Sequence, residues 1–290
     1  MTGERRFRFG AMTAGAGTGQ EWAANARRIE ELGFSTLLCP DTTGTVAPFP
    51  ALSAAAAATT TLRVGTYVLA APLRTPGTVA WETTSLDMLS GGRFELGLGA
   101  GRPGAAHDAA RLGLPFGTAA ERVGLVERTL EAVRARYAAS DATSRHDAVR
   151  GTQQPGPPVL LAGTGPRMLR LAAREASILA LGLPPQSTEE DLAAKIDQAR
   201  KLTGDRFDRL ELNVNVALVG EDAPPHLASW LGVDPRELIR NNSITVLVGT
   251  PRQMADTLLR RRDRAAVSYI TVNAQFADRF APVIELLAGT

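Results

Sequence analysis

The chain has 290 residues, of which 44% are hydrophobic and 21% are charged, and its formal net charge is +2. This length suits one large α/β domain or two ordinary ones, and the composition allows a sizeable buried core. The arginines are spread among acidic residues without a basic run, so nucleic acid is not indicated as a partner.

The cysteine content and the hydropathy of the sequence indicate the cellular compartment of the protein. Cys39 is the only cysteine, which excludes an internal disulfide and is typical of the reducing cytoplasm. The opening MTGERRFRFG is not followed by the apolar segment of a signal peptide. The longest apolar run, around 54–58, is much too short to span a membrane. We therefore expect a cytoplasmic protein without membrane association.

Taken in chain order, short apolar or alternating runs predict eight strands. These strands cover 7–13, 36–40, 62–70, 93–99, 159–162, 177–183, 211–219 and 268–273. Apolar residues at helical spacing predict helices between and after them. The helices cover 20–32, 49–58, 76–89, 117–137, 166–175, 188–202, 251–264 and 276–287. We expect 138–158 to be a polar loop and 223–250 to be irregular, with short helices at 227–231 and 235–240.

Eight strand–helix units over the whole length, with no linker-like segment and no repeat, predict a single (β/α)8 barrel domain spanning 1–290. A doubly wound sheet is the competing fold. In a barrel, the C-terminal ends of the strands form the active face. The residues at these ends include few acids and many small side chains, which favours a floor for a flat heterocycle. They are Met12, Thr13, Asp41, Thr42, Leu69, Ala70, 99–102, 163–165, Gly182, Asn215 and Asn273.

Two glycine-rich loops follow predicted strands. The first lies in LSGGRFELGLGAGR (89–102), and the second, at 163–165, precedes Pro166 and an Arg- and Leu-rich helix. Backbone N–H groups in such loops can approach a flat or anionic ligand closely, and a helix N-terminus suits a phosphate. We interpret the two loops as opposite ends of one cofactor site. The GxGxxG match at 99–104 follows the fourth strand and contains Pro103, which disfavours a Rossmann site.

Several strings resemble the bacterial luciferase-like superfamily, and its actinobacterial branch of coenzyme F420-dependent oxidoreductases in particular. They are ELGFSTLLCPD, TTTLRVGTYVLAAPLRTP, LSGGRFELGLGAG, AGTGPRMLRLAAREAS and VGTPRQMADTLLRRRDRAAVSYITV. The resemblance implies a (β/α)8 barrel with flavin or deazaflavin at the C-terminal strand ends. It implies a cis peptide bond between Tyr67 and Val68 under the ring system, a phosphate on the second glycine loop, and homodimerisation through outer helices.

On this resemblance and the loop chemistry together, we expect a set of cofactor-binding residues and a set of substrate-side candidates. The cofactor set is Tyr67, Val68, Leu69, Gly99, Ala100, Gly101, Gly163, Thr164, Gly165 and Arg167. The candidates for catalysis on the substrate side are Asp41, Thr42, Arg102 and His107. His107 either faces the site or lies on the surface, and Trp230 either packs in the core or covers the substrate. The three histidines lie far apart without paired acids, so no metal site is expected.

Two positions depart from the family pattern. Many members have a His after the Asp that ends the second strand, where this chain has Thr42; some deazaflavin dehydrogenases have a Glu after GAG, where this chain has Arg102. Thr42 cannot act as a general acid–base near neutral pH, and Arg102 can stabilise an anion but does not shuttle protons. Sugar-phosphate dehydrogenation is therefore not expected, whereas reduction of an activated C=C or C=N bond, or oxygen insertion, stays open.

We therefore expect an oxidoreductase that transfers a hydride between F420 and a small organic substrate. One alternative is a monooxygenase on the same fold that uses reduced FMN and oxygen. A second alternative, from a different class, is a catalytically degenerate barrel without cofactor that serves as a binding or partner subunit.

Overall fold

The computed structural model describes residues 5–15, 17–139 and 149–290. Within these residues, nine parallel strands form one closed sheet, in which two short strands share the third position of an eight-position barrel. The strands are β1 (Arg8–Met12), β2 (Thr36–Cys39), β3 (Arg63–Thr66), β4 (Leu69–Ala70), β5 (Phe94–Gly99), β6 (Val159–Ala162), β7 (Ile178–Ala180), β8 (Glu211–Val216) and β11 (Val267–Asn273). The (β/α)8 barrel prediction is confirmed, and the doubly wound sheet is excluded.

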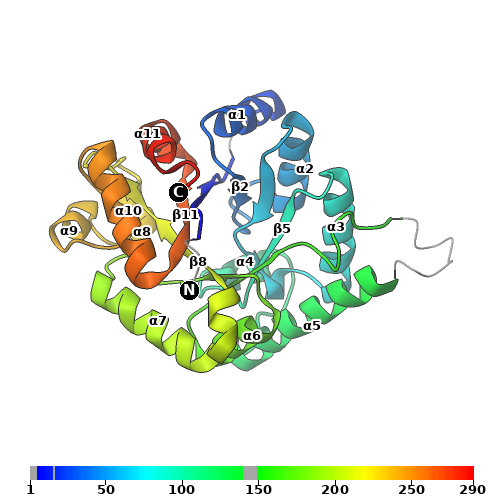
Figure 1. Ribbon diagram of the computed structural model, residues 1–290. Coiled ribbons are helices and arrows are strands. Elements are labelled where there is room, and N and C mark those ends of the chain that lie inside the picture. The colour runs from blue at the N-terminus through cyan, green and yellow to red at the C-terminus, as the bar shows by residue number, and fades with distance from the viewer. Residues whose placement is uncertain (1–4, 16, 140–148) are drawn as a thin grey trace.

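Helices surround the barrel (Figure 1). They are α1 (Gly19–Glu31), α2 (Pro48–Ala58), α3 (Pro76–Leu89), α4 (Ala105–Arg111), α5 (Ala119–Ala138), α6 (Pro166–Glu175), α7 (Glu189–Thr203), α8 (Leu227–Leu231), α9 (Pro235–Arg240), α10 (Pro251–Ala265) and α11 (Ala277–Leu287). Capping boxes begin α1, α5, α7 and α10, as at Thr18 and Glu21, where each side chain bonds the other residue's backbone N–H. Among the described residues, no helix combines the length and the apolar character needed to cross a membrane.

The LSGGR segment shows how sequence sets the approach to β5. Gly91 and Gly92 have φ values of 64° and 82°, the left-handed region that ends α3. Arg93 then donates to the carbonyl oxygens of Leu62 and Ala56, each at 2.7 Å. The guanidinium thus ties the start of β5 to the end of α2 and to the residue before β3.

Apolar side chains pack on both sides of the sheet. The larger cluster fills the space between barrel and helices and includes Leu37, Leu52 and Phe280. A smaller cluster fills part of the barrel interior with side chains from several strands, as strand alternation requires. Its buried members are Met12, Leu38, Leu160, Ile178, Ala180 and Tyr269.

Three segments differ from the sequence prediction. The strand predicted at 62–70 is divided into β3 and β4, with the Tyr67–Val68 peptide bond between them in the cis form that the resemblance implies. The predicted strand 211–219 also divides, because the N–H groups of Ala217 and Leu218 bond Thr245 O instead of the barrel. A separate parallel pair, β9 (Leu218–Val219) with β10 (Val246–Leu247), results. Helix α4 was not predicted, and of the loop predicted at 138–158, residues 140–148 lie outside the described residues.

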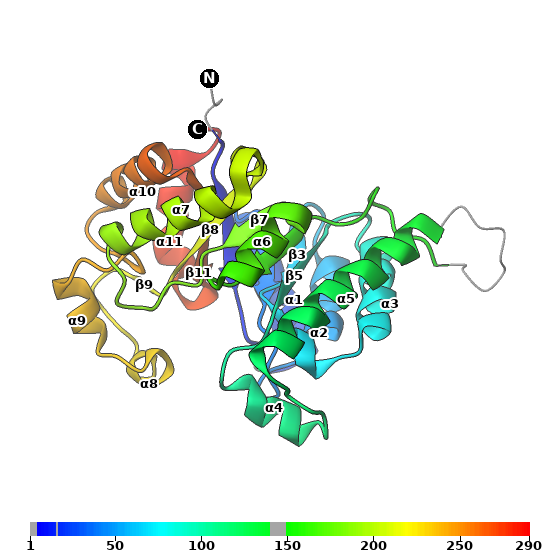
Figure 2. The same cartoon turned by 90° about the horizontal axis from the view of Figure 1, so that it is seen from below.

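The two ends of the barrel differ in what covers them. The C-terminus and the start of β1 lie at one end, where Phe7 N donates to Thr290 O, and α4 and α8 project from the opposite end (Figure 2). Helix α4 follows the C-terminal end of β5, and α8 follows β9. The end that carries α4 and α8 is therefore the C-terminal face, where active sites of such barrels lie.

Candidate active site

A cavity of about 720 Å³ opens at the C-terminal ends of the strands. This volume lies in the range of small-molecule and cofactor sites. Eleven of the candidate residues line it: Asp41, Thr42, Tyr67, Val68, Gly99, Ala100, Gly101, Arg102, Gly163, Thr164 and Gly165. Both glycine loops thus face one cavity.

Three candidates lie outside this lining. Leu69 is buried in the apolar core, and His107 and Arg167 are exposed on α4 and on the first turn of α6. For His107 the structure therefore favours the surface position. The sequence pattern could not show that these residues lie outside the cavity, because α4 is short and because Leu69 is the first residue of a two-residue strand.

Tyr67 and Val68 form the floor of the cavity. The Tyr67 hydroxyl donates a hydrogen bond of 2.6 Å to Asn213 Oδ1, and Asn213 Nδ2 donates to Thr271 Oγ1 at 2.8 Å. Burial raises the pKa of Tyr67, opposed by a side-chain hydrogen bond with Thr271, so the phenol stays neutral near pH 7. A chain of polar groups inside the barrel therefore fixes the ring of Tyr67.

Glycines in β5 let this floor approach the sheet. A Cβ on Gly97 would lie 1.9 Å from the carbonyl oxygen of Thr66, so only glycine fits there. Thr66 Oγ1 and the Gly97 backbone exchange two hydrogen bonds of 2.8 Å. At Gly99, a Cβ would lie 3.0 Å from Val68 Cγ2. Gly97 thus lets β5 approach Thr66, and the absence of a side chain at Gly99 leaves one wall of the cavity flat.

The second glycine loop presents the start of α6 to the cavity. Gly163 has a φ of 154°, and Gly165 occupies the N-cap position without a side-chain hydrogen bond to the helix. Pro166 follows at the first helical position, where its missing N–H costs nothing. The uncapped N–H groups and the positive end of this ten-residue helix suit a phosphate group.

Asp41 lines the cavity, but its carboxylate is engaged elsewhere. Oδ2 accepts from the backbone N–H of Ala70 at 3.0 Å and from Arg74 Nη1 at 2.5 Å. The side chain is only 5% exposed. Asp41 therefore joins the end of β2 to β4 and the turn that follows it, and this geometry gives it a structural role beside the floor.

The structure identifies Asp108, on α4, as a residue that sequence reasoning missed. Its carboxylate accepts from Thr43 Oγ1 at 2.6 Å and from Thr43 N at 3.1 Å. The hydrogen bond from the Thr43 side chain, helped by Thr42 and by the charge of Arg102, lowers the pKa of Asp108. The feature of the sequence that could have indicated Asp108 was a single acidic residue inside the Ala-rich stretch AAHDAAR. Asp108 holds the loop after β2 against α4, and so positions Thr42 beside the cavity.

Asn215 and Trp230 also line the cavity. Asn215 Oδ1 is buried and has no hydrogen-bond partner among the described residues, which is costly unless a ligand supplies a donor. The alternation of Asn213 and Asn215 in the NVNV strand places both on the barrel interior and was readable from the sequence. Trp230 lines the cavity with 49% of its surface exposed. This exposure favours the position in which Trp230 covers the substrate over a position in the core.

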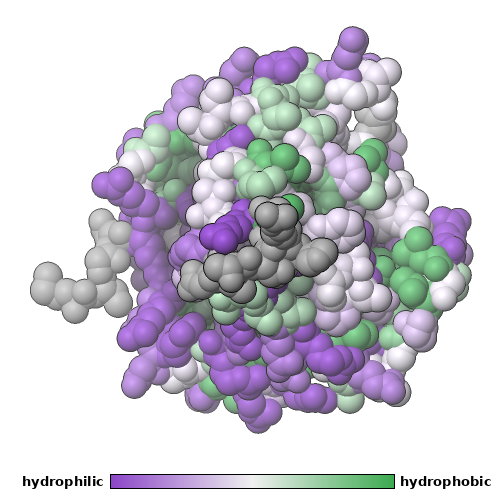
Figure 3. Space-filling view, turned by 90° about the vertical axis from the view of Figure 1, so that its right-hand side faces the viewer, coloured by the Kyte–Doolittle hydropathy of each residue, from purple (hydrophilic) through white to green (hydrophobic). Residues whose placement is uncertain are grey.

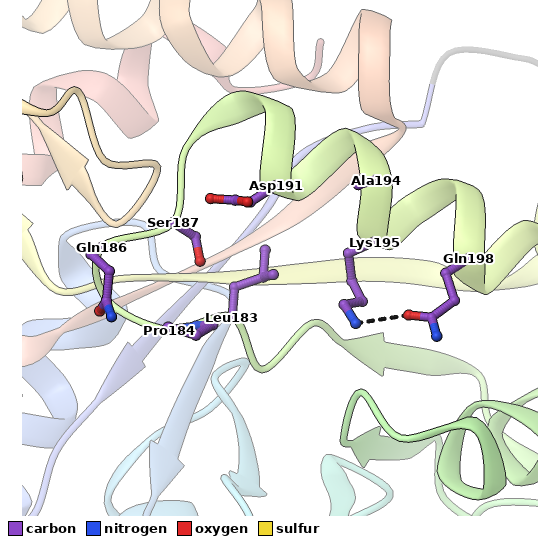
Figure 4. Close-up of a pocket in the computed structure, with 8 residues that line it drawn as sticks. All are labelled: Leu183, Pro184, Gln186, Ser187, Asp191, Ala194, Lys195 and Gln198. Atoms are coloured by element: carbon purple, nitrogen blue, oxygen red, sulfur yellow. Dashed lines mark hydrogen bonds between the residues drawn. The ribbon is translucent and has the colours of Figure 1, made fainter.

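A second pocket, of about 490 Å³, lies between the loop after β7 and α7 (Figure 4). Lys195 Nζ donates to Gln198 Oε1 at 2.8 Å, and Asp191 also lines this pocket. No residue is shared with the lining of the larger cavity. In the described ranges, no group of three or more His, Cys, Asp or Glu residues is placed to hold a metal ion.

The chain matches the family described as luciferase-like monooxygenase over residues 6–224. It therefore belongs to this family of oxidoreductases. The match agrees with a cavity at the C-terminal face whose walls are glycine loops.

Two curated relatives differ in the activity that they are named for. 4-Hydroxyprotoasukamycin monooxygenase of Streptomyces nodosus subsp. asukaensis is 34% identical over 220 residues, which are 69% of this chain and 57% of that protein. F420-dependent glucose-6-phosphate dehydrogenase of Beutenbergia cavernae is 34% identical over 161 residues, which are 50% of this chain and 47% of that protein. The chain thus spans about half the length of the curated relatives it matches.

Solved structures share the fold over nearly the whole chain. Coenzyme F420-dependent tetrahydromethanopterin reductase from Methanopyrus kandleri has a TM-score of 0.75 at 15% identity and covers 97% of each chain. Long-chain alkane monooxygenase has a TM-score of 0.73 at 14% identity and covers 97% of this chain and 92% of that one. The neighbours therefore include enzymes named for F420 and enzymes named as monooxygenases.

Proposed function

We propose that this protein transfers a hydride between the deazaflavin coenzyme F420 and a small organic substrate bound over its ring. The observation that carries the proposal is the cavity, whose two glycine walls and uncapped helix start suit a flat ring with a phosphate-bearing tail. The relative named as an F420-dependent dehydrogenase supports the choice of cofactor.

The residues of the cavity fit such a cofactor. A planar ring can lie against Val68 and Gly99 because no Cβ projects from the glycine. The unpartnered Asn215 Oδ1 can accept from a ring N–H, and the N–H groups at 163–165 can bind the phosphate. When bound in its reduced form, F420 supplies the hydride.

The chain itself positions groups and excludes water. Tyr67 is held as a neutral phenol by Asn213, and Asp41 is held by Arg74, so neither side chain needs to move during the reaction. Arg102 places a positive charge at the cavity, where it stabilises an anionic substrate or product. Trp230 on α8 covers part of the cavity and limits the access of water.

A flavin-dependent monooxygenase is the second candidate. The relative that matches the larger share of this chain, 69%, is named as a monooxygenase. Thr42 also stands where the resemblance places a His in many members of the family, and Arg102 stands where it places a Glu in some deazaflavin dehydrogenases. A protein that binds neither cofactor would instead be the degenerate, partner-binding barrel.

Equilibrium titration with F420 and with FMN tests the proposal. We expect F420 to bind at least about tenfold more tightly than FMN, a difference of about 1.4 kcal/mol. A preference for FMN would support the monooxygenase, and binding of neither would support the degenerate barrel.

A variant pair at position 165 tests the phosphate loop. A Cβ added to Gly165 meets no atom within 4 Å, and Asp or Asn is favoured at an N-cap. Both Gly165→Asp and Gly165→Asn should therefore fold well. The negative charge of Gly165→Asp should weaken F420 binding more than tenfold relative to Gly165→Asn. Equal affinities would place the phosphate elsewhere.

We also propose a homodimer through α3. Trp81, Met88 and Leu89 of this helix are 60%, 42% and 64% exposed. The side of the molecule that carries α3 and α5 shows apolar patches among polar side chains (Figure 3). Sedimentation should give a dimer for the natural sequence and a monomer for Trp81→Glu. A monomeric natural protein would refute this assembly.

A further inference from the structure

We propose that the outer part of the cavity binds a planar, anionic substrate between the indole of Trp230 and the guanidinium of Arg102. The inference deepens the proposed function, on which it rests for the assignment of the inner, glycine-walled part of the cavity to the cofactor. It adds a class of substrate, such as an aromatic carboxylate.

Among the charged side chains that line the cavity, one cation is available to a ligand. Asp41 and Arg102 are the charged residues in its lining, and Asp41 is paired with Arg74. The Arg102 side chain is exposed, and its guanidinium has no ion pair or hydrogen bond within the described residues. Asp108 interacts with its charge without a direct bond. A ligand entering the cavity therefore meets a net positive charge at Arg102.

Trp230 supplies a large flat surface. It lies near the end of α8, on the segment between β9 and β10, the strand pair that is separate from the barrel sheet. Leu227 of the same helix is buried in the core, and Gly232 ends the helix in the left-handed conformation. The helix is thus anchored while the indole remains half exposed at the cavity. Such a side chain stacks well on an aromatic ring.

Trp230 and Arg102 lie beyond the strand ends at which the first cofactor glycines stand. Gly99 and Gly163 lie at strand ends, on the barrel itself. Arg102 follows Gly101 and precedes α4, and Trp230 lies on α8; both helices extend from the same end of the barrel (Figure 2). A molecule stacked over a ring in the inner cavity would therefore reach Trp230 and Arg102 with its outer part.

Two probes of equal shape test this arrangement. 2-Naphthoate and 2-naphthamide share the same rings and differ in charge. In calorimetric titrations of the F420-loaded protein, we expect naphthoate to bind about three- to fivefold more tightly than naphthamide, as an accessible charge pair allows. If F420 does not bind, the same titrations are made on the protein alone, so failure of the cofactor proposal is seen separately.

Variants assign the effect to each side chain. Arg102→Gln should remove the preference for naphthoate while leaving the affinities for naphthamide and F420 unchanged. Trp230→Leu should weaken both probes severalfold. Arg111→Gln is the matched control, because Arg111 is exposed on α4 and does not line the cavity. It should change neither affinity.

Four outcomes would overturn the inference. They are equal binding of the two probes to the natural protein, an equal effect of Arg111→Gln and Arg102→Gln, unchanged binding of both probes to Trp230→Leu, and loss of F420 affinity in Arg102→Gln. The last would assign Arg102 to the cofactor.

Discussion

The two ends of the barrel are built from the same strands and carry opposite chemistry. At the N-terminal end, Glu95 Oε1 accepts from Arg8 Nη2 and Arg63 Nε, each at 2.5 Å, and Arg8 also bonds Glu211. The Arg8 guanidinium lies 4.4 Å from the centre of the Tyr269 ring. This end is filled by paired charges, and Glu95 Oε2 and the Tyr269 hydroxyl are buried there without a hydrogen-bond partner among the described residues. At the C-terminal end, glycines and alanines leave space for the cavity, and the Arg102 guanidinium has no ion pair among the described residues.

Strand β8 passes from one environment to the other. Its inward residues are Glu211, paired with Arg8, then Asn213, bonded to Tyr67 and Thr271, and then Asn215, whose Oδ1 has no partner in the described part of the chain. Polar groups that are satisfied internally stabilise the fold, whereas those left unsatisfied at a cavity are available to a ligand. We therefore expect substitutions at the N-terminal end to change stability and substitutions at the C-terminal end to change ligand binding.

The largest expected effect is at Glu95. Its side chain is 3% exposed and balances two arginines, so Glu95→Gln should lower the free energy of unfolding by about 3–5 kcal/mol. Urea unfolding measures this loss. Glu211→Gln is the matched control, because Glu211 is 20% exposed and pairs with Arg8 alone. Equal losses in the two variants would refute the central role of Glu95.

Tyr67→Phe tests the hydrogen-bonded side chains inside the barrel, between its N-terminal and C-terminal ends. The variant keeps the ring but removes the donor to Asn213 Oδ1, so the free energy of unfolding should fall by about 2 kcal/mol. F420 affinity should change little, because the floor keeps its shape. A large loss of affinity without a loss of stability would mean that the hydroxyl acts on the ligand.

Gly99→Ala tests the open end. The added Cβ would lie 3.0 Å from Val68 Cγ2 and would fill part of the flat wall. The dissociation constant for F420 should rise about tenfold, or about 1.4 kcal/mol. Gly77→Ala is the control, since its Cβ meets no atom within 4 Å and Gly77 lies outside the cavity lining. Unchanged affinity in Gly99→Ala would remove this wall from the cofactor site.

The smallest effect is the pH dependence that Asp108 contributes. The hydrogen bond from Thr43 lowers the pKa of Asp108 in the folded chain below its unfolded value of about 3.9. The stabilisation is therefore complete above that value and is lost as the pH falls through the folded pKa. Asp108→Asn should cost about 1 kcal/mol at pH 7. The unfolding free energies of the two proteins should converge as the pH falls through the lowered pKa of Asp108 in the folded chain, and a constant difference would contradict this role.

The sequence predicted the barrel and most of the cavity lining because alternating strands and helices, and glycines at strand ends, are local signals. It did not predict α4, whose seven residues are too few for periodicity and whose Asp108 bonds Thr43, 65 positions away. The β9–β10 pair depends on Ala217 and Leu218 bonding Thr245, which is another long-range contact. Engagement of Asp41 by Arg74 likewise follows from packing and not from local pattern.

Amide hydrogen exchange, measured with and without F420, tests the central claim most directly. The account predicts slower exchange at 99–102 and 163–168 on addition of F420, with no change at 8–10 and 93–96 near the N-terminal end. Protection at the N-terminal end, or at neither end, would contradict the assignment of the glycine-walled cavity as the cofactor site.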